Sequence, residues 1–340
     1  MKWQHKVVLA AVLASGLPAA AQEVTLKVHH FLPPTSNAHA KLLGPWCERL
    51  AKDSAGRIKC QIYPAMQLGG TAPQLYDQAK DGVADVVWTV TGYTPGRFPK
   101  TEVFELPFMM TNPEGTGHAM WEFVQQYSAD EFRDVRPLAI HPHGGGVFHI
   151  VKRPIKTMAD FHGLKMRAPT RLTNKMLASF GATPVGMPIP QVSEALSKGV
   201  IDGALMPWEV VPAVKVQELV KFHSETDPSQ PAIYTTVFVI AMNKAKYDSL
   251  PPDLKKVIDN NSGVALSTLA GKIFAEGDAA GKATAKNPIN VVPAAEIERW
   301  KKAAQPVIDG WVKEVNDKGA DGPALLAAAR GLIAKYSKQR

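Results

Sequence analysis

One arginine in an apolar setting is the residue whose chemistry the sequence defines best. Arg167 follows Leu164 and Met166 and precedes Ala168 and Pro169. A guanidinium is always charged, and its planar fork of N–H donors matches a carboxylate. The sequence therefore predicts that Arg167 binds an anionic small molecule in a cleft that the rest of the chain builds.

Aromatic residues supply candidates for the other contacts of such a cleft. Trp88 lies near the end of the apolar run 83–90, and Trp208 follows Met206 and Pro207 after a similar run. Core burial is the usual role of tryptophan, but the comparable places of the two residues favour a shared site. Phe148 and Tyr234 lie beside the expected crossings between domains and are weaker candidates for the same site.

Histidines offer a second kind of chemistry. His30 ends the first strand, and ligands of open α/β sheets bind beyond the carboxyl ends of strands; the alternative is a loop histidine bonded to backbone. His141, His143 and His149 are possible metal ligands, but no acidic residue or cysteine lies between Asp134 and Asp160 to complete such a site. We therefore expect no metal and no cofactor.

The run of glycines at 144–146, after His143, resembles the oxyanion loop of some esterases. That chemistry also needs a Gly-x-Ser-x-Gly nucleophile elbow, which the chain does not contain. No Walker loop, dinucleotide fingerprint or metalloprotease helix occurs either. The glycines are thus interpreted as a hinge between domains, and the missing catalytic motifs favour binding over catalysis.

The elements that position these residues alternate between strand and helix. Apolar runs at 24–29, 58–63 and 83–90 are separated by helical patterns, which is typical of a parallel α/β sheet. The segment Lys80–Asp85 is echoed by Lys198–Asp202, and in both a glycine ends a helix and an aspartate precedes a strand. The echo predicts two α/β domains of similar plan that face each other across a cleft.

The first residues are typical of a secretory signal. Lys2 and Lys6 make a positive start, residues 7–17 are apolar, and Ala19–Ala21 is a small-residue cleavage site. The apolar run is much shorter than the ~20 residues of a membrane-spanning helix. We expect export and cleavage after Ala21.

Charge and cysteine content narrow the function further. The formal charge is +8, but lysines and acidic residues are interspersed and form no basic run. This pattern argues against nucleic-acid binding. Cys47 lies on a helical pattern and Cys60 on the next strand. An exported protein permits a disulfide between them, and two buried thiols are the open alternative.

With these residues in place, the sequence resembles the substrate-binding proteins of tripartite ATP-independent periplasmic (TRAP) transporters, of the dicarboxylate-binding type. The motifs that carry the resemblance span nearly the whole mature chain: Gly163–Pro169, Ser193–Gly203, Met242–Lys244, Ser249–Pro252, and Tyr63-Pro64 with Gln67–Gly69. The resemblance implies two α/β domains joined by crossing strands and a long helix, a periplasmic location and a membrane permease as partner. It places Arg167 on the carboxylate-binding arginine of the family.

Domain limits accompany this architecture. We expect residues 22–144 and 233–272 to form domain I, and residues 145–232 and 273–340 to form domain II with the C-terminal helices. Two departures from the family pattern bear on the ligand. Val147 stands where some sugar-acid members carry a second arginine, and Met206 replaces a frequent asparagine. Both remove polar contacts and disfavour a polyhydroxylated sugar acid.

The prediction is therefore a solute receptor for an aromatic or apolar 2-oxo or 2-hydroxy monocarboxylate. Its expected ligand-binding residues are Arg167, Trp208, Trp88, His30, Phe148, Met206 and Tyr234. The alternative from another class is a secreted enzyme that acts on an organic acid, with His30 or His143 as the general base.

Overall fold

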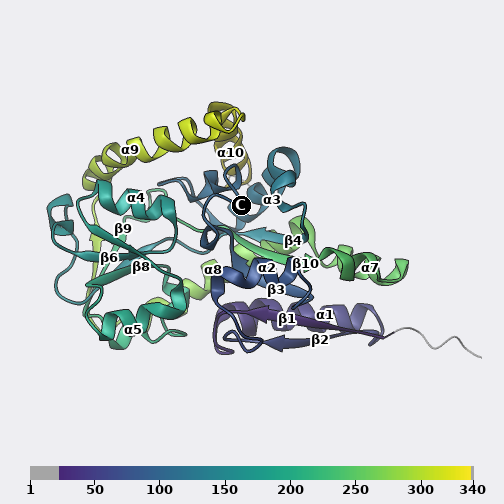
Figure 1. The fold of residues 1–340 in the computed structure, drawn as a ribbon. Coiled ribbons are helices and arrows are strands. Elements are labelled where there is room, and N and C mark those ends of the chain that lie inside the picture. The colour runs from purple at the N-terminus through teal and green to yellow at the C-terminus, as the bar shows by residue number, and fades with distance from the viewer. Residues whose placement is uncertain (1–22, 338–340) are drawn as a thin grey trace, which may run out of the picture.

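Two lobes, each built around its own β-sheet, make up the part of the chain that the structure describes, residues 23–337 (Figure 1). The structure is a computed structural model. The two sheets confirm the predicted two-part α/β fold. The predicted signal segment, residues 1–21, lies outside the described residues. Within residues 23–337 no helix has both the length and the apolar character needed to cross a membrane.

The first sheet has the strand order β2-β1-β3-β10-β4. Its strands are β1 (Val24–His30), β2 (Ile58–Tyr63), β3 (Val86–Val90), β4 (Val135–His141) and β10 (Phe238–Asn243). The strands β2, β1 and β3 run parallel, and β10 lies antiparallel between β3 and β4. The run predicted as a strand from residue 83 begins at Val86, because the preceding residues form the turn that leaves α2 (Leu75–Lys80).

The second sheet has the order β11-β9-β5-β8-β6-β7. Its strands are β5 (Val147–Ile150), β6 (Lys165–Ala168), β7 (Thr183–Gly186), β8 (Gly203–Met206), β9 (Phe222–Thr226) and β11 (Ile289–Val292). Because β5 follows β4 directly but lies in the other sheet, the chain crosses between the lobes at residues 142–146. It crosses back before β10, and the cavity described below lies at these crossings.

An aspartate at the entrance of each of the parallel strands β3 and β8, one in each sheet, accepts a backbone N–H from the neighbouring strand. We call this contact the aspartate bracket. The carboxylate of Asp85 accepts the backbone N–H of Lys27 at 2.8 Å, and that of Asp202 accepts the backbone N–H of Lys165 at 2.9 Å. Gly82 and Gly199, which end the preceding helices, have left-handed φ values of +78° and +67°. The echo in the sequence is thus a repeated structural unit.

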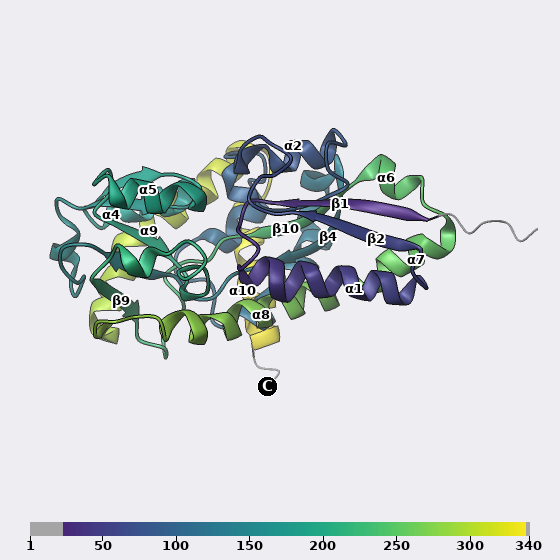
Figure 2. The ribbon, with the colours of Figure 1, turned by 90° about the horizontal axis from the view of Figure 1, so that it is seen from below.

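Helices cover both sheets. They are α1 (Gly44–Asp53), α2 (Leu75–Lys80), α3 (Pro113–Phe123), α4 (Arg171–Ser179), α5 (Val192–Ser197), α6 (Lys244–Asp248), α7 (Pro252–Asn260), α8 (Gly263–Lys282), α9 (Ala294–Asp317) and α10 (Gly322–Ser337). Helices α7 and α8 are separated by a break at residues 261–262, and Gly263 beside it has a φ of +76°. The long helix α8 runs beneath both lobes (Figure 2).

The two C-terminal helices belong to different lobes. Helix α9 packs against α4 of the second lobe, whereas α10 returns and packs against α3 of the first lobe. The sequence predicts both helices in domain II. An amphipathic pattern shows that a helix is half buried but not which lobe buries it. The residue limits of the two domains stay a prediction.

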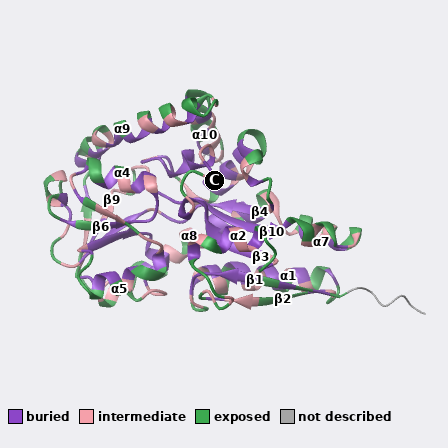
Figure 3. Cartoon of the chain, viewed as in Figure 1, coloured by how far each residue is buried: buried purple, intermediate pink, exposed green. Residues whose placement is uncertain are grey.

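A disulfide joins Cys47 on α1 to Cys60 on β2, which resolves the alternative that the sequence left open. It ties a helix to the edge strand of the first sheet. The strands of both sheets are largely buried, and exposed residues gather on the outer faces of the helices (Figure 3).

Candidate functional site

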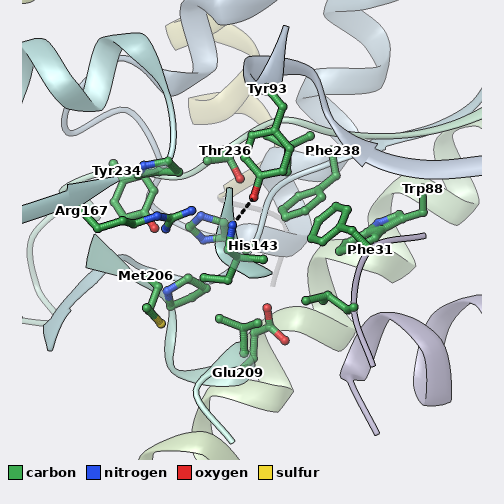
Figure 4. A pocket seen from close by; sticks show the side chains of 16 residues that line it. Phe31, Trp88, Tyr93, His143, Arg167, Met206, Glu209, Tyr234, Thr236 and Phe238 are labelled. Atoms are coloured by element: carbon green, nitrogen blue, oxygen red, sulfur yellow. Dashed lines mark hydrogen bonds between the residues drawn. The ribbon is translucent and has the colours of Figure 1, made fainter. Parts of the chain in front are cut away.

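A cavity between the two lobes brings together residues from both sheets and from the crossings (Figure 4). It is largely apolar, with a small number of polar side chains. Its lining comprises Phe31, Leu32, Trp88, Val90, Tyr93, His143, Arg167, Pro169, Ile189, Met206, Pro207, Glu209, Val210, Tyr234, Thr236 and Phe238. Apolar walls with few convergent polar groups are typical of small-molecule sites.

Arg167 is held rigidly at one side of this cavity. It lies on β6 and is 2% exposed. Its Nε donates to the Met187 carbonyl and its Nη1 to the Leu205 carbonyl, both at 2.9 Å. Five N–H groups are available on a guanidinium, so donors remain for a ligand. No carboxylate is paired with Arg167 among the described residues, and its charge is balanced only by dipoles.

Two phenols accompany the guanidinium. The Tyr93 hydroxyl accepts the backbone N–H of Ile189 at 3.1 Å, drawn as the dashed line in Figure 4. Burial raises the pKa of Tyr93, and burial likewise raises the pKa of Tyr234, in both cases against the opposing effect of Arg167. Both side chains are therefore neutral O–H groups that can donate to an anion.

Stacked aromatic rings form the opposite side of the cavity. Trp88 stacks with both Phe31 and Phe238, with ring centroids 4.9 Å and 4.6 Å away, and its Nε1–H donates to His141 at 3.0 Å. Figure 4 shows these rings facing Arg167 and Tyr234 across the cavity. Since the indole N–H is already paired, this side offers an apolar surface.

An acidic pair lies at the third side. Asp278 of α8 accepts the backbone N–H of Glu209 at 2.9 Å. Burial and then the charge of Asp278 raise the pKa of Glu209 well above its usual range, and burial raises the pKa of Asp278 to about 7. The raised pKa favours the protonated form of Glu209, and its Oε2 has no hydrogen-bond partner among the described residues.

Four of the predicted site residues line the cavity: Arg167, Trp88, Met206 and Tyr234. Met206 also pairs with Val147 in the β5–β8 register, so the two departures from the family pattern are neighbours. A contact of these residues with a ligand stays a prediction.

The expectation that Trp208 faces the cavity is wrong. Trp88 stands three residues after the bracket aspartate Asp85, but Trp208 stands six residues after Asp202, so their places in the repeat are not equivalent. The indole of Trp208 instead packs edge-on against His149 and donates to Glu225 at 3.1 Å.

Phe148 and His30 do not line the cavity either. Phe148 packs edge-on against Phe161 and Trp300 in the core of the second lobe. His30 accepts the backbone N–H of Leu32 at Nδ1, so its Nε2 carries the proton and donates to His39 at 2.9 Å. Both are core residues, because strand ends bury alternate side chains and only some of these point at the site.

The glycines at 144–146 have a steric role. A Cβ on Gly144 would lie 1.7 Å from the Asp278 carboxylate, and one on Gly146 would lie 2.0 Å from the Tyr234 ring. They let these two side chains approach the backbone of the crossing. Whether the segment also acts as a hinge stays a prediction.

Several lining residues were missed from the sequence, above all Phe31, Tyr93, Glu209 and Phe238. The rule that selected His30 would also have found Phe31, which directly follows the same strand, and Tyr93, which follows β3. Glu209 follows β8 at the same distance as Tyr93 follows β3, so the same rule would have found it. No sequence signal marks Phe238, because its place depends on the packing of β10. Among residues 23–337 no group of three or more His, Cys, Asp or Glu side chains is placed to hold a metal ion.

Comparison with known proteins agrees with this geometry. A TRAP solute-binding protein from Rhodoferax ferrireducens T118, solved with copurified benzoate, is 56% identical, with 93% of this chain and 99% of that chain covered and a TM-score of 0.92. A marine metagenome TRAP solute-binding protein specific for aromatic acid ligands, solved with 3-hydroxybenzoate, is 48% identical over 94% of this chain and 100% of that chain, with a TM-score of 0.91.

A more distant structure has a related ligand. The TRAP periplasmic solute-binding protein from Bordetella bronchiseptica, solved with (R)- and (S)-mandelate, is 29% identical, with 92% and 99% of the two chains covered and a TM-score of 0.84. Residues 28–314 of this chain match the bacterial extracellular solute-binding protein family 7, DctP. Proteins of this kind bind small carboxylates and work with membrane permease subunits. The chain belongs to this family of TRAP transporter solute-binding proteins.

Proposed function

We propose that this receptor binds an aromatic monocarboxylate in the inter-lobe cavity and delivers it to its TRAP permease. The observation that carries the proposal is the pairing of one buried, carboxylate-free arginine with a largely apolar cavity that has one aromatic side. An aromatic acid has the same two-part character. Benzoate, hydroxybenzoates and aromatic 2-oxo or 2-hydroxy acids such as mandelate all fall within this class.

The carboxylate is assigned to Arg167. Removing a carboxylate from water is costly unless charge-assisted hydrogen bonds replace its hydration. Arg167 offers a full charge that is already desolvated and oriented by the Met187 and Leu205 carbonyls. Tyr93 and Tyr234 supply neutral donors beside it. Preorganisation of these groups lowers the cost of ordering them when the ligand arrives.

The ring of the ligand is assigned to the aromatic side. Stacked or edge-on contacts between aromatic rings contribute about 0.5–1.5 kcal/mol beyond area burial. Phe31, Trp88 and Phe238 present such surfaces, and Met206 adds an adaptable apolar contact. The ligands of the similar solved structures, benzoate, 3-hydroxybenzoate and mandelate, support this class.

The proposal includes that the chain is a receptor and not an enzyme. His143 lines the cavity, but burial lowers its pKa to about 3, and His30 lies outside the cavity. A general base with so low a pKa is a weak proton acceptor near neutral pH. We further propose that the chain acts in the periplasm after cleavage behind Ala21.

Calorimetric titration of purified protein with benzoate, mandelate, succinate and glucuronate tests the proposal. We expect the aromatic acids to bind, and Arg167→Gln to weaken their binding by about a hundredfold to several thousandfold, because a desolvated carboxylate loses its charged partner, a loss of about 3–5 kcal/mol. The matched control, Arg330→Gln, removes an equal charge from an exposed site and should leave affinity unchanged.

Two results would count against the proposal. The first is wild-type affinity in Arg167→Gln. The second is chemical conversion of the stabilising acid after prolonged incubation, detected by mass spectrometry, which would favour the enzyme.

A further inference from the structure

His143 is the one cavity-lining histidine in the described part of the chain, and its proton can be placed. Its Nδ1 lies 2.5 Å from the Gly144 carbonyl oxygen. A carbonyl only accepts hydrogen bonds, so Nδ1 carries a proton and donates it. Burial, with the positive charge of Arg167 adding to it, disfavours a second proton on the ring. The Nε2 atom is therefore a hydrogen-bond acceptor.

That acceptor has no donor within the described residues. His143 is 3% exposed, and its Nε2 is buried without a partner. The other contacts of the residue are already made: its backbone N–H donates to the Thr235 hydroxyl at 3.2 Å, and its ring meets Tyr234 edge-on at 5.0 Å. These contacts fix the ring in place. A buried acceptor left unpaired weakens any state in which nothing donates to it.

The setting of His143 defines which partner fits. The ring lies beside Arg167 on the side of the cavity assigned to the ligand carboxylate (Figure 4). A carboxylate oxygen is an acceptor and cannot satisfy Nε2. A hydroxyl group donates one hydrogen bond and adds little volume, so it fits both the chemistry and the small space.

We propose that His143 Nε2 accepts a hydrogen bond from a hydroxyl group of the bound acid, so that the receptor selects hydroxylated aromatic acids over their parent acids. This inference rests on the proposed function and narrows its ligand class. The hydroxyl can stand on the carbon next to the carboxylate or on the ring. Both placements offer the same O–H donor.

Matched ligand pairs that differ by one hydroxyl test the inference by calorimetry. The pairs are mandelate with phenylacetate, and 3-hydroxybenzoate with benzoate. We expect the hydroxylated acid of at least one pair to bind about tenfold tighter or more, because the parent acid leaves Nε2 unpaired. The pair that shows the preference locates the hydroxyl beside the carboxylate or on the ring. Equal affinity within both pairs would overturn the inference.

The variant His143→Phe keeps an aromatic ring and removes the acceptor. Whatever its affinity for phenylacetate and benzoate, it should reduce the preference for the hydroxylated acid to less than about threefold. A preference that survives in this variant would overturn the inference. His223→Phe, which changes a buried histidine outside the cavity lining, is the matched control and should keep the preference.

A second measurement needs no variant. Nitrogen NMR of histidine-labelled wild-type protein should show a proton on Nδ1 of His143 and none on Nε2, and the Nε2 signal should move when the hydroxylated acid replaces the parent acid. A proton on Nε2 in the free protein would overturn the inference. If no aromatic acid binds at all, the proposed function itself is wrong, which separates the two failures.

Discussion

The two walls of the cavity share a scaffold and differ in chemistry. Each follows a parallel strand that opens with the same aspartate bracket, at Asp85 or Asp202. Five residues beyond the bracket, Val90 and Pro207 both line the cavity, and eight residues beyond it Tyr93 and Val210 do so. The repeated unit thus places equivalent positions on both sides of the cavity. The two sides differ in the residues that are not repeated, and we propose that these residues determine which part of the ligand each side contacts.

The difference lies in how each wall satisfies its polar groups. In the first lobe, Trp88 has its N–H paired with His141 and presents only ring surface. In the second lobe, Arg167 uses backbone carbonyls for two donors and retains its charge for a ligand. In the proposed function the two lobes therefore contact opposite ends of one ligand.

Removing the aromatic wall should have the largest effect on stability. Trp88→Ala should lower the free energy of unfolding by about 3–5 kcal/mol, because it opens a cavity among Phe31, Phe238 and Phe274. Urea unfolding measures this loss. Trp88→Phe should fold but bind benzoate more weakly, whereas Trp208→Phe should keep wild-type affinity. Equal losses of affinity in the two phenylalanine variants would contradict the different roles assigned to these tryptophans.

The contact between the walls should respond to pH. The carboxyl group of Glu105, in the first lobe, accepts the backbone N–H of Val237 at 3.1 Å and a hydrogen bond from Thr170 of the second lobe. Burial, followed by repulsion from Glu102, raises the pKa of Glu105 from 4.5 to about 8. A raised carboxyl pKa in the folded state favours folding at low pH, and this advantage is lost as pH rises from about 4.5 to 8. Wild type should therefore lose stability relative to Glu105→Gln over this range.

Melting temperatures of both proteins at pH 5 and pH 8 measure that difference. We expect Glu105→Gln to gain several degrees on wild type between these two values. A constant difference would show that Glu105 does not change its protonation between the folded and unfolded states.

Only the first lobe is closed by a disulfide, since both cysteines of the chain lie in it. Replacing Cys47 and Cys60 by serine should lower stability by about 3 kcal/mol, because the unfolded chain regains the freedom of the closed loop. Benzoate affinity should remain within twofold, as the bridge lies between α1 and β2. Reduction of the wild type should give the same shift in urea midpoint, and an unchanged midpoint in both experiments would count against a stabilising role.

The repeated brackets should give the smallest and most nearly equal effects. Asp85→Ala and Asp202→Ala should each lower stability by about 1–2 kcal/mol, because each leaves one backbone N–H at a strand entrance without its acceptor. Asp81→Ala, at an exposed helix end, is the control and should change stability little. A loss at only one bracket would show that the two units are not equivalent.

The repeated parts of this molecule were also the parts that the sequence predicts well. These parts can be recognised in short stretches of sequence. They are the alternation of strands and helices, the glycine and aspartate of each repeated unit, and the charge of Arg167. The family resemblance then implied the two-domain architecture. Trp208 shows where this kind of prediction fails. Its position in the repeat differs by three residues from that of Trp88, and its side chain packs in the core instead of lining the cavity.

The remaining parts depend on tertiary packing. Glu209 lines the cavity with a pKa raised first by burial and second by the charge of Asp278, which lies on a helix far along the chain. The role of His143 depends on the carbonyl beside its Nδ1, which no spacing reveals. Such features follow from the way the lobes meet.

A crystal structure of the protein with benzoate tests the central claim most directly. The account predicts that the benzoate carboxylate lies against the Arg167 guanidinium and that its ring packs against Trp88 and Phe31. Benzoate bound in the reverse orientation, or outside the cavity between the lobes, would contradict it.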